Sequence, residues 1–284
     1  MVVDLNLSVL VNGKPDDCVS SRDRGLLFGD GVFETFAVTD GQPRFWSRHL
    51  RRLGEGCRRL GLPIPDEDVL RDETAALLTG HDAGVLKIIM TRGAGGRGYQ
   101  APANTQPTRI LQWHCWPAVP QECAVNGVRV RLCSTRLGSN PQLAGIKHLN
   151  RLEQVLARRE WDDPDIREGL LLDAEGNVIE GTMSNLFVVQ GSTLVTPDLT
   201  RCGVAGIMRT VVMELAAGLG LDVSVQPLPL AGVERAEEVF LTNSLIGIWP
   251  VIELDNRMWR AGVMTRQLQE RLANLKTEGT AWQH

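Results

Sequence analysis

Short apolar runs rich in β-branched residues recur along the chain and constrain its fold more than any other feature. Five of them are SVLVNG at 8–13, FETFAV at 33–38, GVLKIIMTRG at 84–93, TRILQWHCW at 108–116 and VRVRLCS at 128–134. Runs of this length, bounded by glycine and other turn residues, are typical of β-strands. The Asp40-Gly41 pair follows the second run and predicts a hairpin turn.

Two helical patterns separate these runs. The first covers 47–61, with Ser47 as the predicted N-cap, and it ends at Gly61 because Pro63 forbids continuation. The second covers 66–80 and has acidic residues in its first turn, where they favour the helix dipole. Strands and helices in this mixture predict an α+β fold for the first part of the chain.

A segment rich in proline and glycine predicts the domain boundary. We expect an N-terminal α+β domain at 1–116, a linker at 117–127 and a C-terminal domain at 128–284. Beyond the linker, patterns predict helices at 151–161 and 206–220, a hairpin at 168–181 with its turn at 175–177, and strands at 184–190 and 237–243. The polar tail after 274 is expected to be loosely held.

Composition excludes several classes of protein. The chain of 284 residues has a net charge of −4, from 30 basic and 34 acidic residues, which argues against a nucleic-acid partner. No apolar run reaches the roughly 20 residues that a membrane span needs, and the first residues do not resemble a signal peptide. The six cysteines lack metal-binding spacing, so we expect no metal site and a cytoplasmic location.

Lysine is scarce, which narrows the search for a catalytic amine. Only four of the 30 basic residues are lysine, and one of them, Lys147, lies between an apolar approach and a helix in LAGIKHLNRLEQVL. The neighbouring His148 and Arg151 add positive potential, which favours the neutral amine that Schiff-base chemistry needs. A solvated lysine at the edge of a strand is the alternative.

Other segments offer ligands for an anion and for a ring nitrogen. Glu180, at the end of the predicted hairpin, is either an exposed edge-strand carboxylate or a partner for a cationic ring nitrogen. Three features could bind phosphate: the glycine-bearing loop at 203–209 that opens a helix, the polar strand end with Ser244, and Arg52. Arg52 belongs to a helix with many arginines, so a solvated helix face is the alternative.

The segment TRGAGGRGYQ at 91–100 is not a dinucleotide-binding fingerprint, because no strand–helix–strand unit follows it. It holds Arg92, Arg97 and Tyr99, the only tyrosine of the chain. A glycine-rich loop with these residues fits a flexible lid over an anionic substrate. A mobile surface turn is the alternative.

In their order along the chain, these segments resemble the fold-type-IV pyridoxal-phosphate (PLP) enzymes. This group contains branched-chain aminotransferases, D-amino-acid aminotransferases and aminodeoxychorismate lyases. The resemblance runs from RDRGLLFGDGVFET at 22–35 to EVFLTNSLIGI at 238–248. It implies an α+β fold of two domains with PLP at the domain interface, and a homodimer.

The same resemblance implies roles for single residues. Lys147 would form the Schiff base with PLP, and Glu180 would meet the pyridine nitrogen. The phosphate would be held by four residues, two of them through main-chain N–H groups: Arg52, Ile207, Met208 and Ser244.

Two segments, NPQLAGIKHLNRLEQVL and TRGAGGRGYQ, are similar to aminodeoxychorismate lyases in particular. This implies a small substrate with two carboxylates, which is converted to 4-aminobenzoate and pyruvate. The candidate substrate contacts are Arg92, Arg97, Tyr99, His148 and Arg151. Two alternatives stay open: a branched-chain or D-amino-acid aminotransferase on the same fold, and a non-catalytic protein that binds a small anion.

Overall fold

The computed structural model describes residues 8–117 and 122–275, which form two compact units. Unit 1 comprises the described residues up to Pro117 together with the segment Ile146–Asn150. Unit 2 comprises residues 122–145 and Arg151–Leu275. The sequence placed Lys147 in the second domain, whereas its segment lies in unit 1. Part of the predicted linker, the predicted tail and Lys276 fall outside the described residues.

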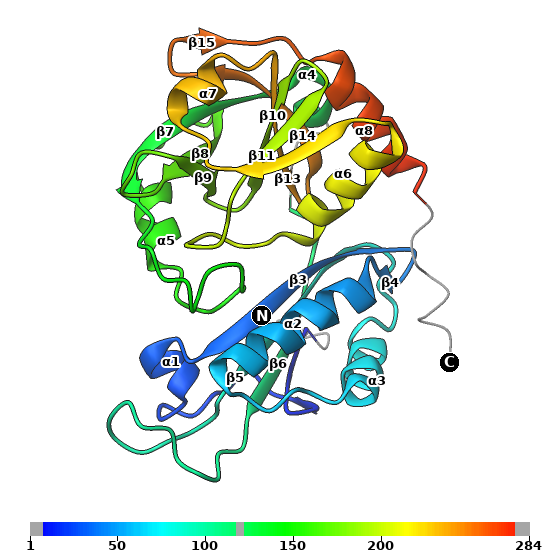
Figure 1. Cartoon of the computed structure of the whole chain (residues 1–284). Helices are drawn as coiled ribbons and strands as arrows, with labels where there is room; N and C mark the ends of the chain where they lie inside the picture. The colour runs from blue at the N-terminus through cyan, green and yellow to red at the C-terminus, as the bar shows by residue number, and fades with distance from the viewer. Residues whose placement is uncertain (1–7, 118–121, 276–284) are drawn as a thin grey trace. The chain divides into compact units, whose positions relative to one another are not determined.

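Unit 1 is built on an antiparallel sheet of six strands (Figure 1), in the order β2-β1-β6-β5-β3-β4. The strands are β1 Val9–Val11, β2 Lys14–Pro15, β3 Gly31–Thr39, β4 Gln42–Pro43, β5 Gly84–Thr91 and β6 Thr108–His114. The turn predicted at Asp40-Gly41 is confirmed, because both residues have a left-handed backbone (φ 53° and 69°) and join β3 to β4. Left-handed turns of this kind match the twist of paired strands.

Three helices belong to unit 1: α1 Arg24–Phe28, α2 Trp46–Leu60 and α3 Glu67–Leu77. Ser47 as the N-cap of α2 was wrong. Phe45 occupies that position with φ 56° and makes no side-chain cap hydrogen bond. Trp46 is buried and lies against Phe36 of β3, with ring centres 5.3 Å apart. Burial of this large ring therefore fixes where the helix begins, against the local preference of serine for caps.

Unit 2 is built on a nine-stranded sheet in the order β12-β11-β10-β13-β14-β7-β8-β9, with β15 beside β14. The strands are β7 Val128–Arg136, β8 Ile166–Leu172, β9 Val178–Gly181, β10 Asn185–Gln190, β11 Thr193–Pro197, β12 Asp222–Gln226, β13 Glu238–Asn243, β14 Gly247–Leu254 and β15 Arg257–Met258. β9 also pairs with β10 through Glu180 and Asn185, so the sheet closes into a barrel-like structure.

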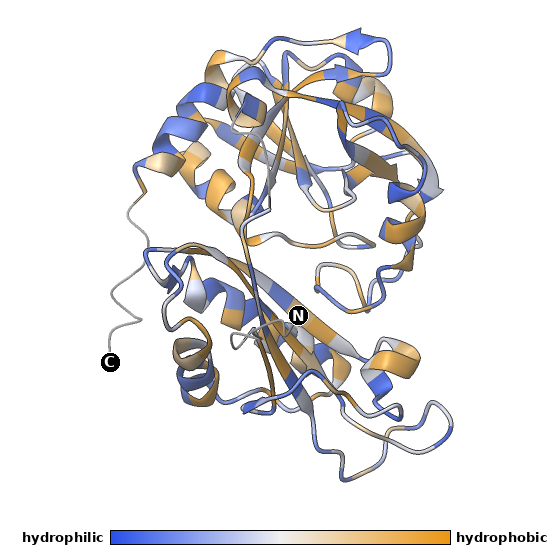
Figure 2. Ribbon diagram, turned by 180° about the vertical axis from the view of Figure 1, so that it is seen from behind, coloured by the Kyte–Doolittle hydropathy of each residue, from blue (hydrophilic) through white to orange (hydrophobic). Residues whose placement is uncertain are grey.

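The helices of unit 2 are α4 Glu122–Asn126, α5 Leu152–Arg158, α6 Ile207–Gly218, α7 Leu230–Glu234 and α8 Val263–Ala273. The hairpin predicted at 168–181 is confirmed as β8 and β9. Hydrophobic residues gather along the strands of each unit (Figure 2), in agreement with a separate buried cluster in each. The predicted α+β class is confirmed. Among the described helices, none combines the length and apolarity needed to cross a membrane.

Candidate functional site

Lys147 is positioned by strand-like pairing of its own segment with the beginning of β3. The N–H of Phe33 donates to the Lys147 carbonyl at 2.9 Å, and Val32 forms a β-bridge with His148. The Lys147 ammonium lies 4.5 Å from the centre of the Phe33 ring. Backbone pairing thus fixes the attachment point of the lysine, and an aromatic face borders its amine.

On the buried face of β3 lies a cluster formed by Glu34, His49 and Arg52. The Glu34 side chain is fully buried and accepts two hydrogen bonds from Arg52, from Nε at 2.8 Å and from Nη2 at 2.5 Å. It also accepts the Nδ1–H of His49 at 2.6 Å. Both partners come from α2, one turn apart, so a helix face crossing β3 assembles the cluster.

The charge state of this cluster follows from its burial and its pairing. Burial alone would raise the pKa of Glu34, but Arg52 and His49 outweigh it and lower that pKa to about 2. Burial lowers the pKa of His49, against the effect of Glu34, and the nearby Arg52 and Lys147 lower it further. At neutral pH the cluster therefore holds an ionised Glu34, a cationic Arg52 and a neutral His49.

In unit 2, Glu180 is buried at the end of β9, only 4% exposed. Its Oε2 accepts the N–H of Val204 at 2.8 Å. Asn185, the strand partner of Glu180, donates from Nδ2 to the carbonyl of Val204 at 2.8 Å. The carboxylate and the loop that leads into α6 are thus held together by three hydrogen-bonding residues.

The beginning of α6 has main-chain N–H groups that an anion could reach. Its N-cap is Gly206, which makes no side-chain cap hydrogen bond. A methyl group at Gly206 would lie 2.1 Å from Oδ1 of Asn185, so a larger residue there would force the Asn185 side chain to move. Ile207 and Met208, both buried, provide the first main-chain N–H groups of the helix. An uncapped helix start of this kind suits an anion.

A second buried carboxylate, Glu168, shapes the turn between β9 and β10. It accepts the main-chain N–H groups of Thr182 (3.0 Å) and Met183 (3.2 Å) and the hydroxyl of Ser184 (2.8 Å). It also accepts the N–H of Gly169 at 2.9 Å. This turn directly follows Glu180, so Glu168 fixes the end of the strand that carries it.

The remaining predicted phosphate ligand, Ser244, lies in the turn after β13. Its neighbours shape that turn: the Thr242 hydroxyl donates to the Gly247 carbonyl at 2.6 Å, and Asn243 Oδ1 accepts the N–H groups of Leu245 and Ile246. Ser244 is half-buried. A side-chain hydroxyl is therefore presented on a turn that its neighbours stabilise.

The predicted substrate contacts have different surroundings. Arg92 donates to Asp30, to the Gly61 carbonyl and to the Leu60 carbonyl, so its guanidinium is used within unit 1. The side chains of Arg97 and Tyr99 are exposed, the latter at 87%.

His148 is half-buried beside Lys147 in unit 1. Arg151 occupies the N-cap position of α5 in unit 2. The structure gives these positions, and the substrate roles stay predictions.

The predicted lid is held at one point by a side chain of the same unit, and its role as a lid stays a prediction. The loop from Gly93 to Pro107 has little regular structure, but the guanidinium of Arg24 binds the carbonyls of Gly98 and Tyr99. A buried cation therefore fixes the middle of the loop.

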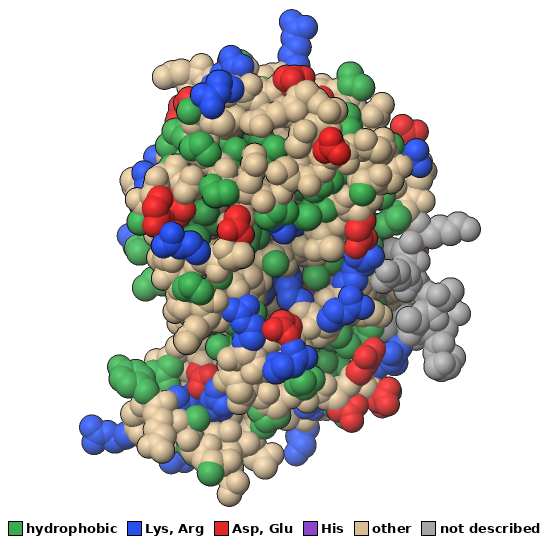
Figure 3. All heavy atoms as spheres, in the orientation of Figure 1, with side chains coloured by type: hydrophobic (Ala, Val, Ile, Leu, Met, Phe, Trp, Pro, Cys, Tyr) green, Lys and Arg blue, Asp and Glu red, His purple; other side chains and the backbone are tan. Residues whose placement is uncertain are grey.

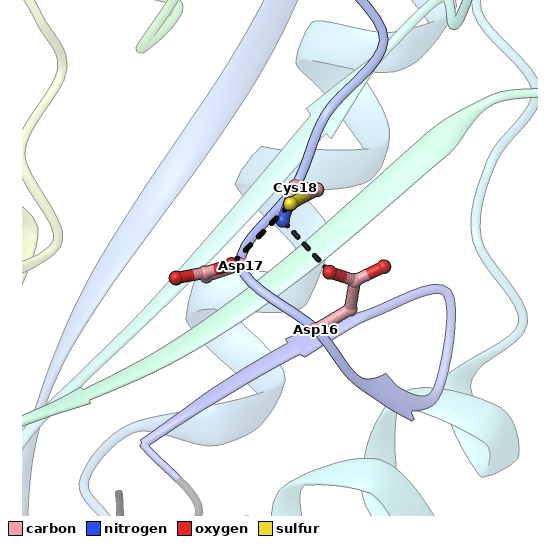
Figure 4. Close-up of side chains that lie close together, drawn as sticks. All are labelled: Asp16, Asp17 and Cys18. Carbon is pink, nitrogen blue, oxygen red and sulfur yellow. Dashed lines mark hydrogen bonds between the residues drawn. The ribbon is translucent and has the colours of Figure 1, made fainter. Parts of the chain in front are cut away.

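One group of acidic and thiol side chains lies apart from these residues. Among the described residues, Asp16, Asp17 and Cys18 form the group whose ligand atoms could meet at a metal ion, and all three are exposed (Figure 4). Asp16 Oδ1 accepts the N–H of Cys18 at 2.9 Å, and Cys18 Sγ donates to Asp17. Hydrogen bonding to Asp17 raises the pKa of the Cys18 thiol. These contacts describe an ordinary turn after β2.

Comparison with known proteins assigns the family. The model of the class IV amino-transferase family matches residues 31–254, which covers most of the chain. The chain belongs to the class IV aminotransferase family. The match contains β3, the Lys147 segment, Glu180 and the beginning of α6.

Individual members of this family differ in how similar they are to the chain. The chain is 38% identical to an aminodeoxychorismate lyase of Vibrio harveyi, covering 92% of this chain and 98% of that protein. It is 27% identical to a D-alanine aminotransferase of Bacillus licheniformis, covering 97% and 99%. The crystal structure of 4-amino-4-deoxychorismate lyase from Pseudomonas aeruginosa superposes with a TM-score of 0.90 at 51% identity, covering 93% and 97%. The resemblance to the fold-type-IV enzymes is confirmed.

Several residues of the site were not predicted from the sequence. Glu34 and His49 lie inside segments for which the sequence predicts a strand and a basic helix, and Asn185 lies inside a predicted strand. A charged residue in the middle of the apolar run FETFAV was the available signal, because a carboxylate is buried only when it has a partner. The partner itself, on α2, could not be read from local sequence.

Proposed function

We propose that this protein is a PLP-dependent oxo-acid lyase that converts 4-amino-4-deoxychorismate to 4-aminobenzoate and pyruvate, a step toward folate. The observation that carries the proposal is the 51% identity to 4-amino-4-deoxychorismate lyase of P. aeruginosa over 93% of the chain. Aminotransferases belong to the same family, so family membership alone does not choose the reaction. Identity of this extent favours a shared substrate.

The residues of unit 2 fit the cofactor. The uncapped beginning of α6 would hold the phosphate through the N–H groups of Ile207 and Met208, and Ser244 would add its hydroxyl. Glu180 would bind the pyridine nitrogen, because a buried carboxylate can accept roughly four hydrogen bonds and keeps a ring nitrogen protonated.

The residues of unit 1 fit it as well. Lys147 would supply the amine for the Schiff base, and Arg52 would bind the phosphate. Arg52 is oriented by its two hydrogen bonds to Glu34. A guanidinium has five N–H donors, so it can bind phosphate while this pair stays intact.

The chemistry divides between the cofactor and the chain. Bound PLP supplies an electron sink for negative charge at the substrate carbon that carries the amine. The Lys147 amine takes the proton from C4 of the substrate, acting as the general base. Glu180 stabilises the positive ring nitrogen on which that sink depends. Loss of the C4 proton and of the enolpyruvyl group leaves an aromatic ring, and this drives the reaction.

The substrate carries two carboxylates, and the chain offers cations for them. Arg97 is the strongest candidate, because its side chain is exposed and lies next to Gly98, whose carbonyl is fixed. Tyr99, His148 and Arg151 are further candidates. Arg92 would act through Asp30, to which its guanidinium is already bound. A desolvated contact between arginine and carboxylate contributes about 1.5–3 kcal/mol.

A branched-chain or D-amino-acid aminotransferase is the second candidate. The 27% identity to a D-alanine aminotransferase over 97% of the chain favours keeping it. An aminotransferase would convert bound PLP to the pyridoxamine form when given an amino acid alone. The lyase returns the cofactor unchanged after each turnover.

The deciding experiment incubates the purified, PLP-loaded protein with 4-amino-4-deoxychorismate and measures 4-aminobenzoate and pyruvate together. We expect both products in equal amounts, and none from Lys147→Ala. The matched control Lys14→Ala removes an exposed lysine and should leave turnover unchanged. Transfer of the amine to a 2-oxo acid without 4-aminobenzoate formation would establish the aminotransferase instead.

We further propose a cytoplasmic homodimer. Two helices expose apolar side chains: Leu26 and Leu27 on α1 (69% and 50% exposed), and Leu152, Val155 and Leu156 on α5. Hydrophobic side chains over α1 are visible in Figure 3. Exposed apolar surface of this kind favours burial against a second copy. The six cysteines are free, which suits a reducing compartment. Light scattering should give twice the monomer mass of 31.2 kDa.

A further inference from the structure

The strongest unassigned feature of unit 1 is a buried arginine that no step of the proposed reaction uses. Arg24, at the start of α1, is only 4% exposed. Its guanidinium donates in three directions: from Nε to Asp30 at 2.9 Å, from Nη1 to the Gly98 carbonyl at 3.0 Å and from Nη2 to the Tyr99 carbonyl at 2.8 Å. All three nitrogens of the fork are used.

We infer that Arg24 is a positioning residue for substrate binding, which holds the loop at 93–107 so that Arg97 is presented to a substrate carboxylate. The inference rests on the proposed function, because Arg97 is a substrate contact only there. Arg24 binds the carbonyls of Gly98 and Tyr99, the two residues that follow Arg97. The position of Arg97 is therefore set from within the protein, before any substrate arrives.

The first part of the loop is held by main chain. The Arg24 N–H donates to the Gly93 carbonyl at 2.9 Å, and Asp23 forms a β-bridge with Ala94. Asp23 itself accepts the hydroxyls of Thr91 and Thr108, at the ends of β5 and β6. The helix that carries Arg24 is thus attached to both strands from which the loop projects.

Asp30 links Arg24 to the end of α2 through Arg92. It accepts Arg92 at 2.7 Å and 3.1 Å, in addition to Arg24, and its pKa is lowered because hydrogen bonds from Arg92 and Arg24 outweigh burial. Arg92 in turn donates to the carbonyls of Leu60 and Gly61 at the end of α2. These carbonyls lack partners within a helix, so the arginine satisfies them.

The residues on either side of Asp30 also bind the segment that carries Lys147. Asn150 Nδ2 donates to the carbonyl of Gly29, and Leu149 N–H donates to the carbonyl of Gly31. Asp30 lies between these two glycines in the chain. Within unit 1, Arg24 therefore fixes the loop relative to the strand segment that carries Lys147.

Arginine is required by the geometry of the contacts. Two carbonyls and one carboxylate are met by a planar fork, which a lysine ammonium on its flexible stem cannot reproduce. The guanidinium also lies 4.8 Å from the centre of the Phe28 ring, and this ring lies 5.4 Å from that of Tyr99. The left-handed backbone of Gly98 (φ 87°) presents the carbonyls to the fork.

The test compares Arg24→Lys and Arg24→Gln with the wild type, all loaded with PLP. We expect KM for 4-amino-4-deoxychorismate to rise about tenfold or more, because substrate must now order the loop, while kcat changes less than threefold. PLP affinity and absorbance should be unchanged. Hydrogen exchange of the amides at 95–101 should accelerate in both variants without substrate. Arg22→Gln, which removes an exposed guanidinium nearby, is the matched control and should behave as wild type.

The outcomes separate this inference from the proposed function. If the wild type makes no 4-aminobenzoate, the proposed function fails, and loop exchange still shows whether Arg24 orders the loop. An unchanged KM and unchanged loop exchange in Arg24→Lys would overturn the inference. A fall in kcat and PLP affinity with KM unchanged would also overturn it, because Arg24 would then support the fold as a whole. Should Arg24→Gln not fold, Arg24→Lys decides alone.

Discussion

Two carboxylates are equally buried in the two units and are held in opposite ways. Glu34 in unit 1 is matched by a charge, through two hydrogen bonds from Arg52 and one from His49. Glu168 in unit 2 is matched by dipoles, through main-chain N–H groups and the hydroxyls of Thr182 and Ser184. The difference follows from their neighbours. A helix crossing a strand brings long side chains, whereas a tight turn brings main chain.

The two carboxylates control different parts of the molecule. Glu34 orients Arg52, so a change there should affect both folding and the phosphate ligand. Glu168 orients the backbone after Glu180, so a change there should move a strand end and leave the charges of unit 1 untouched. Ion pairing and dipole pairing also respond differently to loss of charge, and this difference can be measured.

The largest effect is expected from Glu34→Ala. It leaves Arg52, whose side chain is only 12% exposed, without its anion, and removing one partner of a buried pair costs about 3–5 kcal/mol. Urea denaturation of wild type and variant measures the free energy of unfolding. Glu73→Ala, which removes the partner of Arg109 in a more exposed ion pair, should cost less. If both variants lost the same free energy of unfolding, the buried Glu34 would stabilise the fold no more than Glu73 does.

In the unmodified protein, the ion pair of Glu34 should make the free energy of unfolding fall at acid pH. The pKa of Glu34 is about 2 in the folded state, below its ordinary value of 4.5. Its stabilisation is complete above pH 4.5 and is lost as the pH falls toward 2, a change of about 3 kcal/mol. The lowered pKa of His49 acts in the same direction, since unfolding then takes up a proton below about pH 6.5.

Unfolding free energies measured from pH 7 to pH 3 test this point. Glu34→Gln has no carboxyl group to titrate at that position, so its stability should fall less steeply between pH 4.5 and pH 3. Parallel curves for the variant and the wild type would show that Glu34 contributes nothing to acid sensitivity.

Glu180→Gln tests the charge of a carboxylate that, like Glu168, is bound by a main-chain N–H group. The amide keeps the shape and can still accept the N–H of Val204, so PLP should bind. It cannot stabilise a positive ring nitrogen, and kcat should fall about a hundredfold or more. Steady-state kinetics beside a PLP titration separates the two effects. A kcat near that of wild type would remove Glu180 from this role.

The smallest effect is expected from Glu168→Gln. One oxygen becomes an NH2 group and then faces hydrogen-bond donors of the turn, which costs about 1–3 kcal/mol. Because no arginine is left unpaired, the loss should be smaller than that of Glu34→Ala. Thermal unfolding of both variants side by side gives the order. A greater loss for Glu168→Gln would mean that the turn, and not the ion pair, carries the stability.

Local sequence predicted the elements that local chemistry determines. The turn at Asp40-Gly41, the hairpin of β8 and β9, and the end of α2 at Gly61 all follow from glycine and from strand patterns. Elements without such signals were missed. α1 has five residues, too few for a helical period, and β14 contains Pro250, which normally argues against a strand. A shift in register after Val251 accommodates it beside β7.

The site shows the same limit. Lys147, Glu180 and the start of α6 carry chemical types that can be singled out in a sequence. The contacts that orient them join residues far apart, as Glu34 joins α2 and as Arg24 joins the loop at 93–107. Such pairings depend on tertiary structure, so the ligands can be predicted from the sequence, whereas the residues that orient them cannot.

The pairing of Ile146–Asn150 with β3 bears on how the chain folds while it is being synthesised. β4 covers only Val38 and Thr39 on that edge of β3, and the stretch from Gly31 to Phe33 is covered by Lys147 and Leu149. At a translation rate of about 5–20 residues per second, this edge waits roughly 6 to 20 seconds for its partner to leave the ribosome. An open strand edge is prone to wrong pairing during that time. Closing this edge and delivering the lysine are a single event in the life of the nascent chain.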